Sequence, residues 1–132
     1  MTFEGMNYLA ILLAAISGMV AGAAWYGALA KPWMKAVGMT GEPKGEPKIY
    51  IIALIAQFVI AYVLAGLIGH MGPLTVSSGI VSALFAWVGF TLAPMAVNHR
   101  FQDNGWDLTL IDGGYWLVVF VLQGAIIGWM GV

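Results

Sequence analysis

The sequence contains little charge and no cysteine. Only 5 Lys and Arg and 6 Asp and Glu occur among 132 residues, whereas about a quarter of the residues in a soluble domain are charged. The formal net charge of −1 provides no basic field for nucleic acid. The absence of cysteine excludes disulfide bonds, thiolate metal sites and a cysteine nucleophile. A surface this poor in charge points to lipid, rather than water, as the surrounding medium.

Apolar residues make up 61% of the sequence, and they fall into four long runs. These runs cover residues 7–30, 49–69, 74–97 and 108–132, and each is long enough for a helix of ~20 residues to cross a bilayer. The predicted fold is an all-α integral membrane protein of one domain, with four transmembrane helices in a compact bundle. Loops are expected at 31–48 and 98–107. In the first loop, "KPWMKAVG" is compatible with a short interfacial helix that ends before a glycine.

Basic residues predict how the helices are oriented. All 5 lie in the two connections on one side of a four-span chain, namely Lys31, Lys35, Lys44, Lys48 and Arg100. The positive-inside rule makes them topology anchors on the cytoplasmic side. The prediction is therefore a multi-pass protein with both termini outside (N-out, C-out).

Two segments resemble those of a known family. Residues 7–38, "NYLAILLAAISGMVAGAAWYGALAKPWMKAVG", combine an Asn start, a stripe of small residues and a Trp-Tyr pair. Residues 97–128, "VNHRFQDNGWDLTLIDGGYWLVVFVLQGAIIG", join a short polar loop to a Gly-Tyr-Trp helix. Both are similar to the opening and closing segments of small bacterial membrane proteins catalogued as domain of unknown function 1761. The resemblance implies four spans and a bacterial cytoplasmic (inner) membrane, and it brings no established activity with it.

Small residues at helical spacing predict where helices approach closely, because lipid gives helices little hydrophobic reason to associate. The predicted helix-packing positions are Gly18, Gly22, Ala65, Gly69, Gly124 and Gly128. A single bundle can absorb these stripes internally, so a homo-oligomer is compatible with the sequence but not required by it. The expected partners are membrane lipids and either a parallel homodimer or other membrane subunits, with no nucleic acid.

The few polar residues inside the spans are candidates for a polar path or a substrate contact. The candidates, with the aromatic residues near them, are Asp112, Gln57, Gln123, Ser82, Trp116 and Tyr115. Asp112 and Gln123 return to nearly the same helix face at about 100° per residue. The structural alternatives are a Gln123–Ser82 hydrogen bond and a Gln57 clamp between helices.

Asp112 also has two interpretations. The two glycines that follow it leave room for another backbone or a ligand. Alternatively, Asp112 is an acid near a helix start that complements the helix dipole, with Asp107 as the N-cap.

The segment "NHRFQDNGWDLTLIDGGYW" (98–116) could form a metal or catalytic cluster of His99, Asp103, Asp107 and Asp112. His99 and Asp103 share a helix face only if the third helix continues into this segment, and "DNG" predicts a turn. A zinc enzyme usually brings three protein ligands, commonly with more than one His. We therefore expect no catalytic, metal or cofactor site, and no cofactor.

Two functional classes remain. One is a structural or accessory membrane protein that binds partners or lipids and is not an enzyme. The alternative is a small oligomeric carrier or channel that uses Asp112, Gln57 and Gln123 along a polar path.

Overall fold

The structure, a computed structural model, describes residues 6–41 and 43–131. Its long helical segments are Tyr8–Ala28 (α1), Pro47–His70 (α3), Val76–Phe101 and Trp106–Met130 (α6), and each is long and apolar enough to cross a membrane. A short helix, α2 (Ala30–Val37), follows α1, and the described residues contain no strand. The prediction of an all-helical chain with four apolar spans is confirmed.

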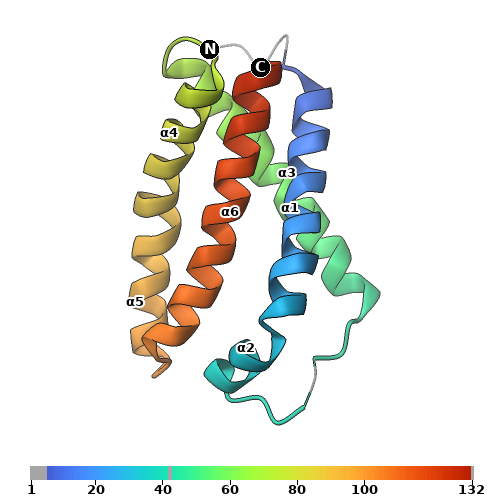
Figure 1. The fold of residues 1–132 in the computed structure, drawn as a ribbon, viewed down its shortest axis with the longest axis vertical. Coiled ribbons are helices and arrows are strands. Elements are labelled where there is room, and N and C mark those ends of the chain that lie inside the picture. Colours follow the sequence, from blue (N-terminus) through green and yellow to red (C-terminus); the bar gives the residue numbers. More distant parts are fainter. Residues whose placement is uncertain (1–5, 42, 132) are drawn as a thin grey trace.

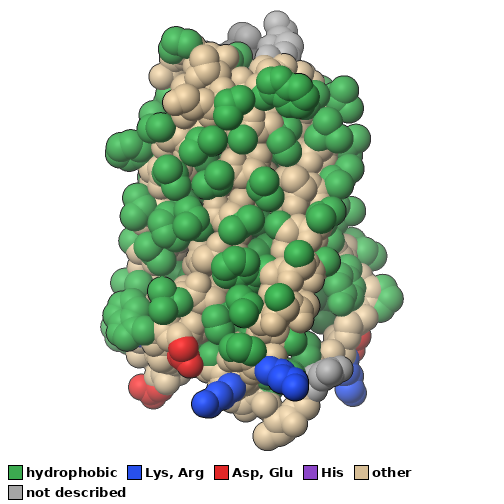
Figure 2. Space-filling model, viewed as in Figure 1, with side chains coloured by type: hydrophobic (Ala, Val, Ile, Leu, Met, Phe, Trp, Pro, Cys, Tyr) green, Lys and Arg blue, Asp and Glu red, His purple; other side chains and the backbone are tan. Residues whose placement is uncertain are grey.

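The four long segments alternate in direction, so their connections fall at two opposite ends of the molecule (Figure 1). The start of α1, the end of α6 and the turn at 71–75 lie at one end, which we call the terminal end. The other end, which we call the loop end, holds α2, the connection to α3 and the turn at 102–105. On the face shown in Figure 2, the charged side chains gather at the loop end and the sides are mostly apolar. This distribution is the one expected of a bundle whose sides face lipid.

The third span is longer than predicted. It was expected to end at residue 97, but it continues through α4 (Val76–Trp87), a π-helix η1 (Val88–Leu92) and α5 (Ala93–Phe101). The predicted bounds of the loop, 98–107, are therefore wrong at both ends, and the turn forms at 102–105. The helix continues through "NHRF" because these residues contain no helix breaker. Asp103 in this turn has φ 59°, a left-handed conformation that Asp tolerates better than most residues. The longer helix carries His99 and Arg100 towards α6.

The last span also starts earlier than predicted, at Trp106 rather than at residue 108. The prediction that Asp107 caps this helix is wrong, because Gly105 holds the N-cap position. Asp107 lies in the first turn, where its Oδ1 accepts a hydrogen bond from the Leu108 N–H at 2.9 Å. An acid in this turn still complements the positive end of the helix dipole. The first two spans differ from their predicted bounds, 7–30 and 49–69, by one or two residues at each end. Val132, at the end of the fourth predicted span, lies outside the described residues.

Local sequence explains where several helices begin and end. The Asn7 side chain accepts a hydrogen bond from the Ala10 N–H at 3.1 Å and donates one to the Met130 carbonyl at 3.0 Å. It therefore caps α1 and ties that helix to the end of α6. Gly38 ends α2 with φ 84°, a conformation that glycine adopts without steric cost.

A proline accounts for the irregular winding of the third segment. Pro94 has no N–H to donate, and its ring clashes with the carbonyl four residues earlier in a regular α-helix. The preceding stretch, η1, is a π-helix, in which the Ala93 N–H bonds to the Val88 carbonyl one residue beyond the α-helical partner. The wider turn lets the segment pass the proline without ending.

The central helix of the bundle is α6, which packs most extensively against α4 and α1, while α1 packs against α3. Glycines bring α4 and α6 close together. A Cβ added to Gly124 would lie 2.5 Å from the Gly79 carbonyl oxygen, and a Cβ on Gly128 would collide with the Thr75 backbone. Contacts of this kind replace the hydrophobic drive that is missing between helices in lipid.

The other predicted packing positions differ in their surroundings. Gly18 of α1 lies against the Gln57 side chain, and Gly22 lies against the Tyr115 ring. Ala65 is buried at 1% exposure. Gly69 is exposed near the end of α3, whereas Gly66, one turn earlier, is buried.

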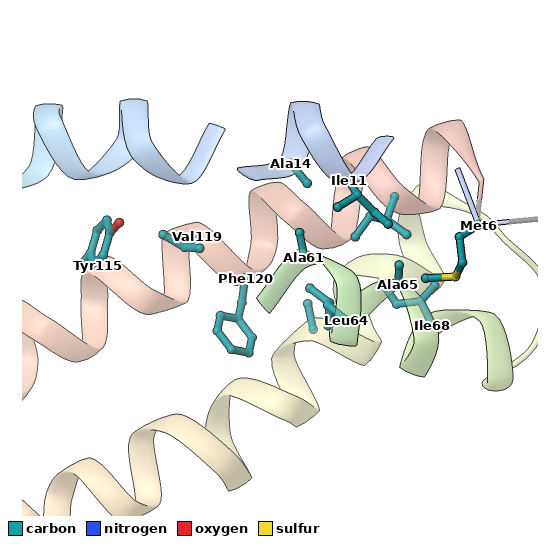
Figure 3. Packing of buried hydrophobic residues seen from close by; sticks show 12 residues of the cluster. Met6, Ile11, Ala14, Ala61, Leu64, Ala65, Ile68, Tyr115, Val119 and Phe120 are labelled. Carbon is teal, nitrogen blue, oxygen red and sulfur yellow. The ribbon is translucent and has the colours of Figure 1, made fainter. Parts of the chain in front are cut away.

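Buried apolar side chains form one cluster along the inner faces of the helices (Figure 3). The labelled members are Ile11 and Ala14 of α1, Ala61, Leu64, Ala65 and Ile68 of α3, and Tyr115, Val119 and Phe120 of α6, with Met6 before α1. Only 17–33% of the most apolar window of each span is buried. The remaining apolar surface is what a membrane would cover.

Candidate functional site

The candidate site surrounds Asp112, which lies about two turns into α6 at the loop end. The Tyr26 hydroxyl of α1 donates a hydrogen bond to Asp112 Oδ1 at 2.7 Å. His99 Nε2 of α5 lies 4.0 Å from Asp112 Oδ2, and the Asp112 side chain is 23% exposed. A distance of 4.0 Å is too long for a hydrogen bond. Oδ2 therefore keeps its capacity to accept a bond from a ligand.

His99 is oriented by a buried hydroxyl. Its Nδ1 lies 2.8 Å from Thr109 Oγ1, and the same oxygen accepts a hydrogen bond from Arg100 Nη2 at 2.6 Å. The Thr109 hydroxyl has one proton and two lone pairs, so while it accepts from Arg100 it can either donate to His99 Nδ1 or accept from it.

Arg100 ties α5 to the start of α6. Its guanidinium lies 3.7 Å from the centre of the Trp106 ring, and its Nη2 also donates to the Gly105 carbonyl at 2.9 Å. Nε and Nη1 are buried with no hydrogen-bond partner among the described residues, so the ring supplies a cation–π attraction in place of such bonds. The other predicted topology anchors, Lys31, Lys35, Lys44 and Lys48, are all exposed at the loop end.

The two glycines after Asp112 lie against neighbouring helices, and Gly114 admits an indole ring. A Cβ on Gly114 would lie 2.8 Å from Cζ2 of Trp25, and the Trp25 Nε1–H donates to the Ile111 carbonyl at 2.9 Å. On the other side of α6, the Trp87 Nε1–H donates to the Gly113 carbonyl at 3.0 Å. Gly114 thus provides room for close approach, which the Trp25 ring fills, whereas the Leu92 and Met95 side chains lie against Gly113.

A cavity of about 600 Å³ opens beside Asp112. Its lining comes from α1, α2, the following loop and α6, and consists of Tyr26, Ala30, Trp33, Met34, Pro43, Asp112 and Trp116. The Tyr26 and Trp33 rings meet edge to face, with centroids 6.0 Å apart and planes inclined at 80°. Trp116 lies against Tyr115, with centroids 4.8 Å apart. We call this cavity the Asp112 pocket, and it combines one carboxylate with three aromatic rings.

A separate line of hydrogen bonds runs through the buried middle of the bundle. The Tyr115 hydroxyl donates to the Gly18 carbonyl at 3.0 Å and accepts from Gln57 Nε2 at 2.9 Å. Gln57 Oε1 accepts from Gln123 Nε2 at 2.8 Å. Gln57 and Gln123 are 1% and 0% exposed, and Gln123 Oε1 is buried without a hydrogen-bond partner in the described part of the chain. The inter-helix clamp expected of Gln57 is present in this line.

The expected Gln123–Ser82 hydrogen bond is wrong, because the Gln123 amide donates to Gln57 instead. Close packing explains the difference. Gly79 and Gly124 bring the backbones of α4 and α6 together, while Gly18 leaves space on α1 for the Gln57 side chain. Ser82 is buried at 6% exposure on α4.

The comparison with protein families identifies the chain. A family model described as a protein of unknown function (DUF1761) matches residues 9–128. The chain belongs to the DUF1761 family. No curated protein and no solved structure gives a significant match.

In this DUF1761 chain, the predicted site residues divide between two places. Asp112 and Trp116 line the Asp112 pocket, whereas Gln57, Gln123 and Tyr115 belong to the buried line of hydrogen bonds. The rings of Tyr26 and Tyr115 connect the two places, with centroids 5.1 Å apart.

Sequence reasoning missed the residues that α1 and α2 contribute to the pocket. Tyr26, Trp33, Met34 and Pro43 are not among the candidate site residues predicted from the sequence. The available signal was the Trp-Tyr pair at the end of α1, followed by Trp33 in the next helix. The approach of Trp33 and Met34 to the pocket depends on α2 packing against α6, which no local pattern specifies.

The alternative cluster of His99, Asp103, Asp107 and Asp112 is only partly assembled. His99 approaches Asp112, while Asp107 bonds to the backbone of its own helix. Residues 6–41 and 43–131 contain no group of three or more His, Asp or Glu placed to hold a metal ion. The hydroxyl that meets His99 belongs to Thr109, which is only 2% exposed and holds Arg100.

Proposed function

We propose that this protein is a non-enzymatic, ligand-binding protein of the bacterial cytoplasmic membrane, and that the Asp112 pocket is its binding site. The observation that supports this proposal most directly is a cavity of about 600 Å³ with a partly exposed carboxylate in its wall. Small-molecule sites typically measure about 300–1,000 Å³ and combine apolar walls with a few polar groups. The pocket has this size and composition, and it lies at the loop end, where a lipid headgroup or a cytoplasmic molecule can reach it.

Several features support binding rather than catalysis. The serines of the third segment are at positions 77, 78 and 82, towards the terminal end, while His99 is at the loop end. Thr109, the hydroxyl beside His99, is buried and already bonded to Arg100. Neither His99 nor Thr109 is among the described residues that line the pocket, so the ligand meets the carboxylate and the aromatic rings.

The membrane and its orientation are part of the same proposal. Four apolar spans and a loop end that carries the basic residues support insertion with that end in the cytoplasm. The pocket then faces the cytoplasmic surface of the membrane, and both termini face outward. Exposed apolar faces on all four spans are available to lipid or to a second subunit in a parallel homodimer.

The test fills the pocket without removing a polar group. Ala30 lines the pocket, so Ala30→Phe should occupy part of its volume, and Ala24→Phe on the exposed face of α1 is the matched control. We expect native mass spectrometry of the purified protein to detect one retained lipid or small molecule in wild type and in Ala24→Phe, and a loss of it in Ala30→Phe. Equal retention by all three proteins, or no retained molecule in any of them, would contradict binding at this pocket.

A small carrier is the second candidate, and the buried line of hydrogen bonds favours it. Asp112 contacts Tyr26, whose ring meets Tyr115, and from there the line continues to Gln57 and Gln123. The unpaired Gln123 Oε1 is a further polar group towards the terminal half. Both amides are fully packed, so passage would require the helices to separate. Substrate flux in proteoliposomes that is lost in Asp112→Asn would favour the carrier over a binding protein.

A further inference from the structure

The chemistry of the Asp112 pocket indicates what kind of molecule it binds. We propose that the pocket binds an organic ammonium group, held by the Asp112 carboxylate and the faces of Tyr26, Trp33 and Trp116. This inference rests on the proposed function and adds the ligand class to it.

The charge inside the pocket argues against the other ligand classes. Among the described residues that line the pocket, Asp112 is the only one with a formally charged side chain. An anionic ligand would be repelled by it, and a neutral apolar ligand would cover the carboxylate without supplying a counter-charge, which is costly. A cation instead pairs with the Asp112 carboxylate, whose Oδ2 accepts no hydrogen bond from the described residues and lies 4.0 Å from His99 Nε2.

The aromatic rings supply the second half of the recognition. The face of a Trp or Tyr ring attracts a cation within about 6 Å, and cages of such rings bind quaternary ammonium groups. The Tyr26 and Trp33 planes are inclined at 80°, so they form two walls rather than one flat stack. Trp116 follows Asp112 by one helical turn and provides a third wall on the same side of α6.

The Tyr26 hydroxyl links the carboxylate to the rings. It donates to Asp112 Oδ1 at 2.7 Å, which fixes the carboxylate and uses the hydroxyl proton. Among the described side chains of the lining, the remaining polar hydrogens are the indole N–H groups of Trp33 and Trp116. Two indole donors beside an ionised acid are a poor phosphate site, and they leave the carboxylate as the strongest recognition element.

Two sources can supply the same ammonium chemistry. One is the headgroup of an aminophospholipid, and the other is a free amphipathic amine or quaternary ammonium compound. Lys31 and Lys35 are exposed on α2, the helix that also carries Trp33. They could meet the phosphate of a lipid whose ammonium group enters the pocket, so the two sources have to be separated by experiment.

The test uses the full-length protein in nanodiscs of phosphatidylglycerol, whose headgroup has no amine. Benzyltrimethylammonium is titrated by calorimetry, and its uncharged isostere neopentylbenzene and anionic phenylmethanesulfonate serve as competitors. We expect saturable binding of the cation, with no competition from the other two compounds. Asp112→Asn keeps an oxygen for Tyr26 and should weaken binding at least about tenfold, and Trp33→Leu should weaken it several-fold. Asp107→Asn removes the same charge outside the pocket and should bind as wild type does.

A second measurement identifies the source of the ammonium group. Adding phosphatidylethanolamine to the nanodiscs should weaken binding of the probe if the headgroup occupies the pocket, and should leave it unchanged if the ligand is a free amine. The ammonium assignment is overturned if the probe does not saturate, if neopentylbenzene competes equally, or if both Asn variants bind alike. The comparison of cation and isostere needs only the wild-type protein, so a poorly folded variant does not remove the test. If the probe fails while Ala30→Phe still displaces a retained molecule, the pocket stands and only the ligand class is wrong.

Discussion

The polar residues of the bundle differ in how deeply they are buried. Asp112 lies near the loop end with 23% of its side chain exposed, whereas Gln57 and Gln123 are almost fully buried. An ionised carboxylate in hydrocarbon costs more than an amide and needs water or a partner. Amides can satisfy one another across helices, as Gln57 and Gln123 do. The deep positions therefore hold helices together, and the shallow carboxylate is left for a ligand.

Tyr115 is the residue on which this buried line of hydrogen bonds depends. Tyr115→Phe removes the hydroxyl and leaves the Gly18 carbonyl and Gln57 Nε2 without their partner. Because bonds of this kind in membranes contribute roughly 0.5–2 kcal/mol, we expect a lower free energy of unfolding by about 1–2 kcal/mol. Thermal unfolding in detergent measures the change.

Tyr8→Phe is the control, since Tyr8 is 62% exposed. If the two variants unfold at the same temperature, the buried hydroxyl contributes nothing measurable and the line of hydrogen bonds has no structural role.

At the scale of the helices, close backbone contact holds α4 against α6. The contact depends on Gly79, Gly124 and Gly128, where a side chain on one helix would collide with the backbone of the other. The π-turn Val88–Leu92 lies further along the same segment, before Pro94. The segment can therefore continue to Phe101 and deliver His99 to Asp112.

Gly124→Ala tests this contact. Its new Cβ would lie 2.5 Å from the Gly79 carbonyl oxygen and 2.8 Å from the Ala83 Cβ, and a backbone cannot move aside as a flexible side chain can. We expect a loss of about 1–3 kcal/mol in the free energy of unfolding, the usual range for overpacking. Unfolding in detergent, followed by circular dichroism, measures it.

The matched control is Gly27→Ala on α1, where an added Cβ would meet nothing within 4 Å. Alanine favours a helix over glycine by roughly 0.5–1 kcal/mol, so this variant should be neutral or slightly more stable. Equal stability of the two variants would show that α4 and α6 separate without cost.

The helices could be predicted where their signal is local. Hydropathy placed all four spans, and Gly38 marked the end of α2. The end of the third span was missed because "NHRF" is polar enough for a loop and equally compatible with a helix. The hydrogen-bond partner of the Gln123 amide was missed for another reason. Whether Gln123 meets Ser82 or Gln57 depends on how closely the helices approach, which is a property of the packed bundle.

At the scale of the whole molecule, the two ends differ in chemistry. The loop end carries all 5 basic side chains, the Asp112 pocket and the amphipathic helix α2. The terminal end carries the tight turn at 71–75 and no Lys or Arg among its described residues. A ligand that enters the pocket therefore approaches from one side of the membrane, and orientation decides which compartment supplies it.

The last prediction is a single orientation with the loop end in the cytoplasm. A chain that inserts both ways and pairs head to tail needs almost equal numbers of Lys and Arg on its two sides, whereas all 5 lie here on one side. Any homodimer is then parallel, with its axis along the membrane normal. The chain lacks cysteine, so Thr40→Cys in the α2–α3 loop and Met71→Cys at the terminal end each give one labelling site. With a membrane-impermeant maleimide, we expect intact cells to label Met71→Cys, and Thr40→Cys to react only after the membrane is opened. Comparable labelling of both in intact cells would mean mixed insertion, and the parallel dimer and the cytoplasmic pocket would both have to be abandoned.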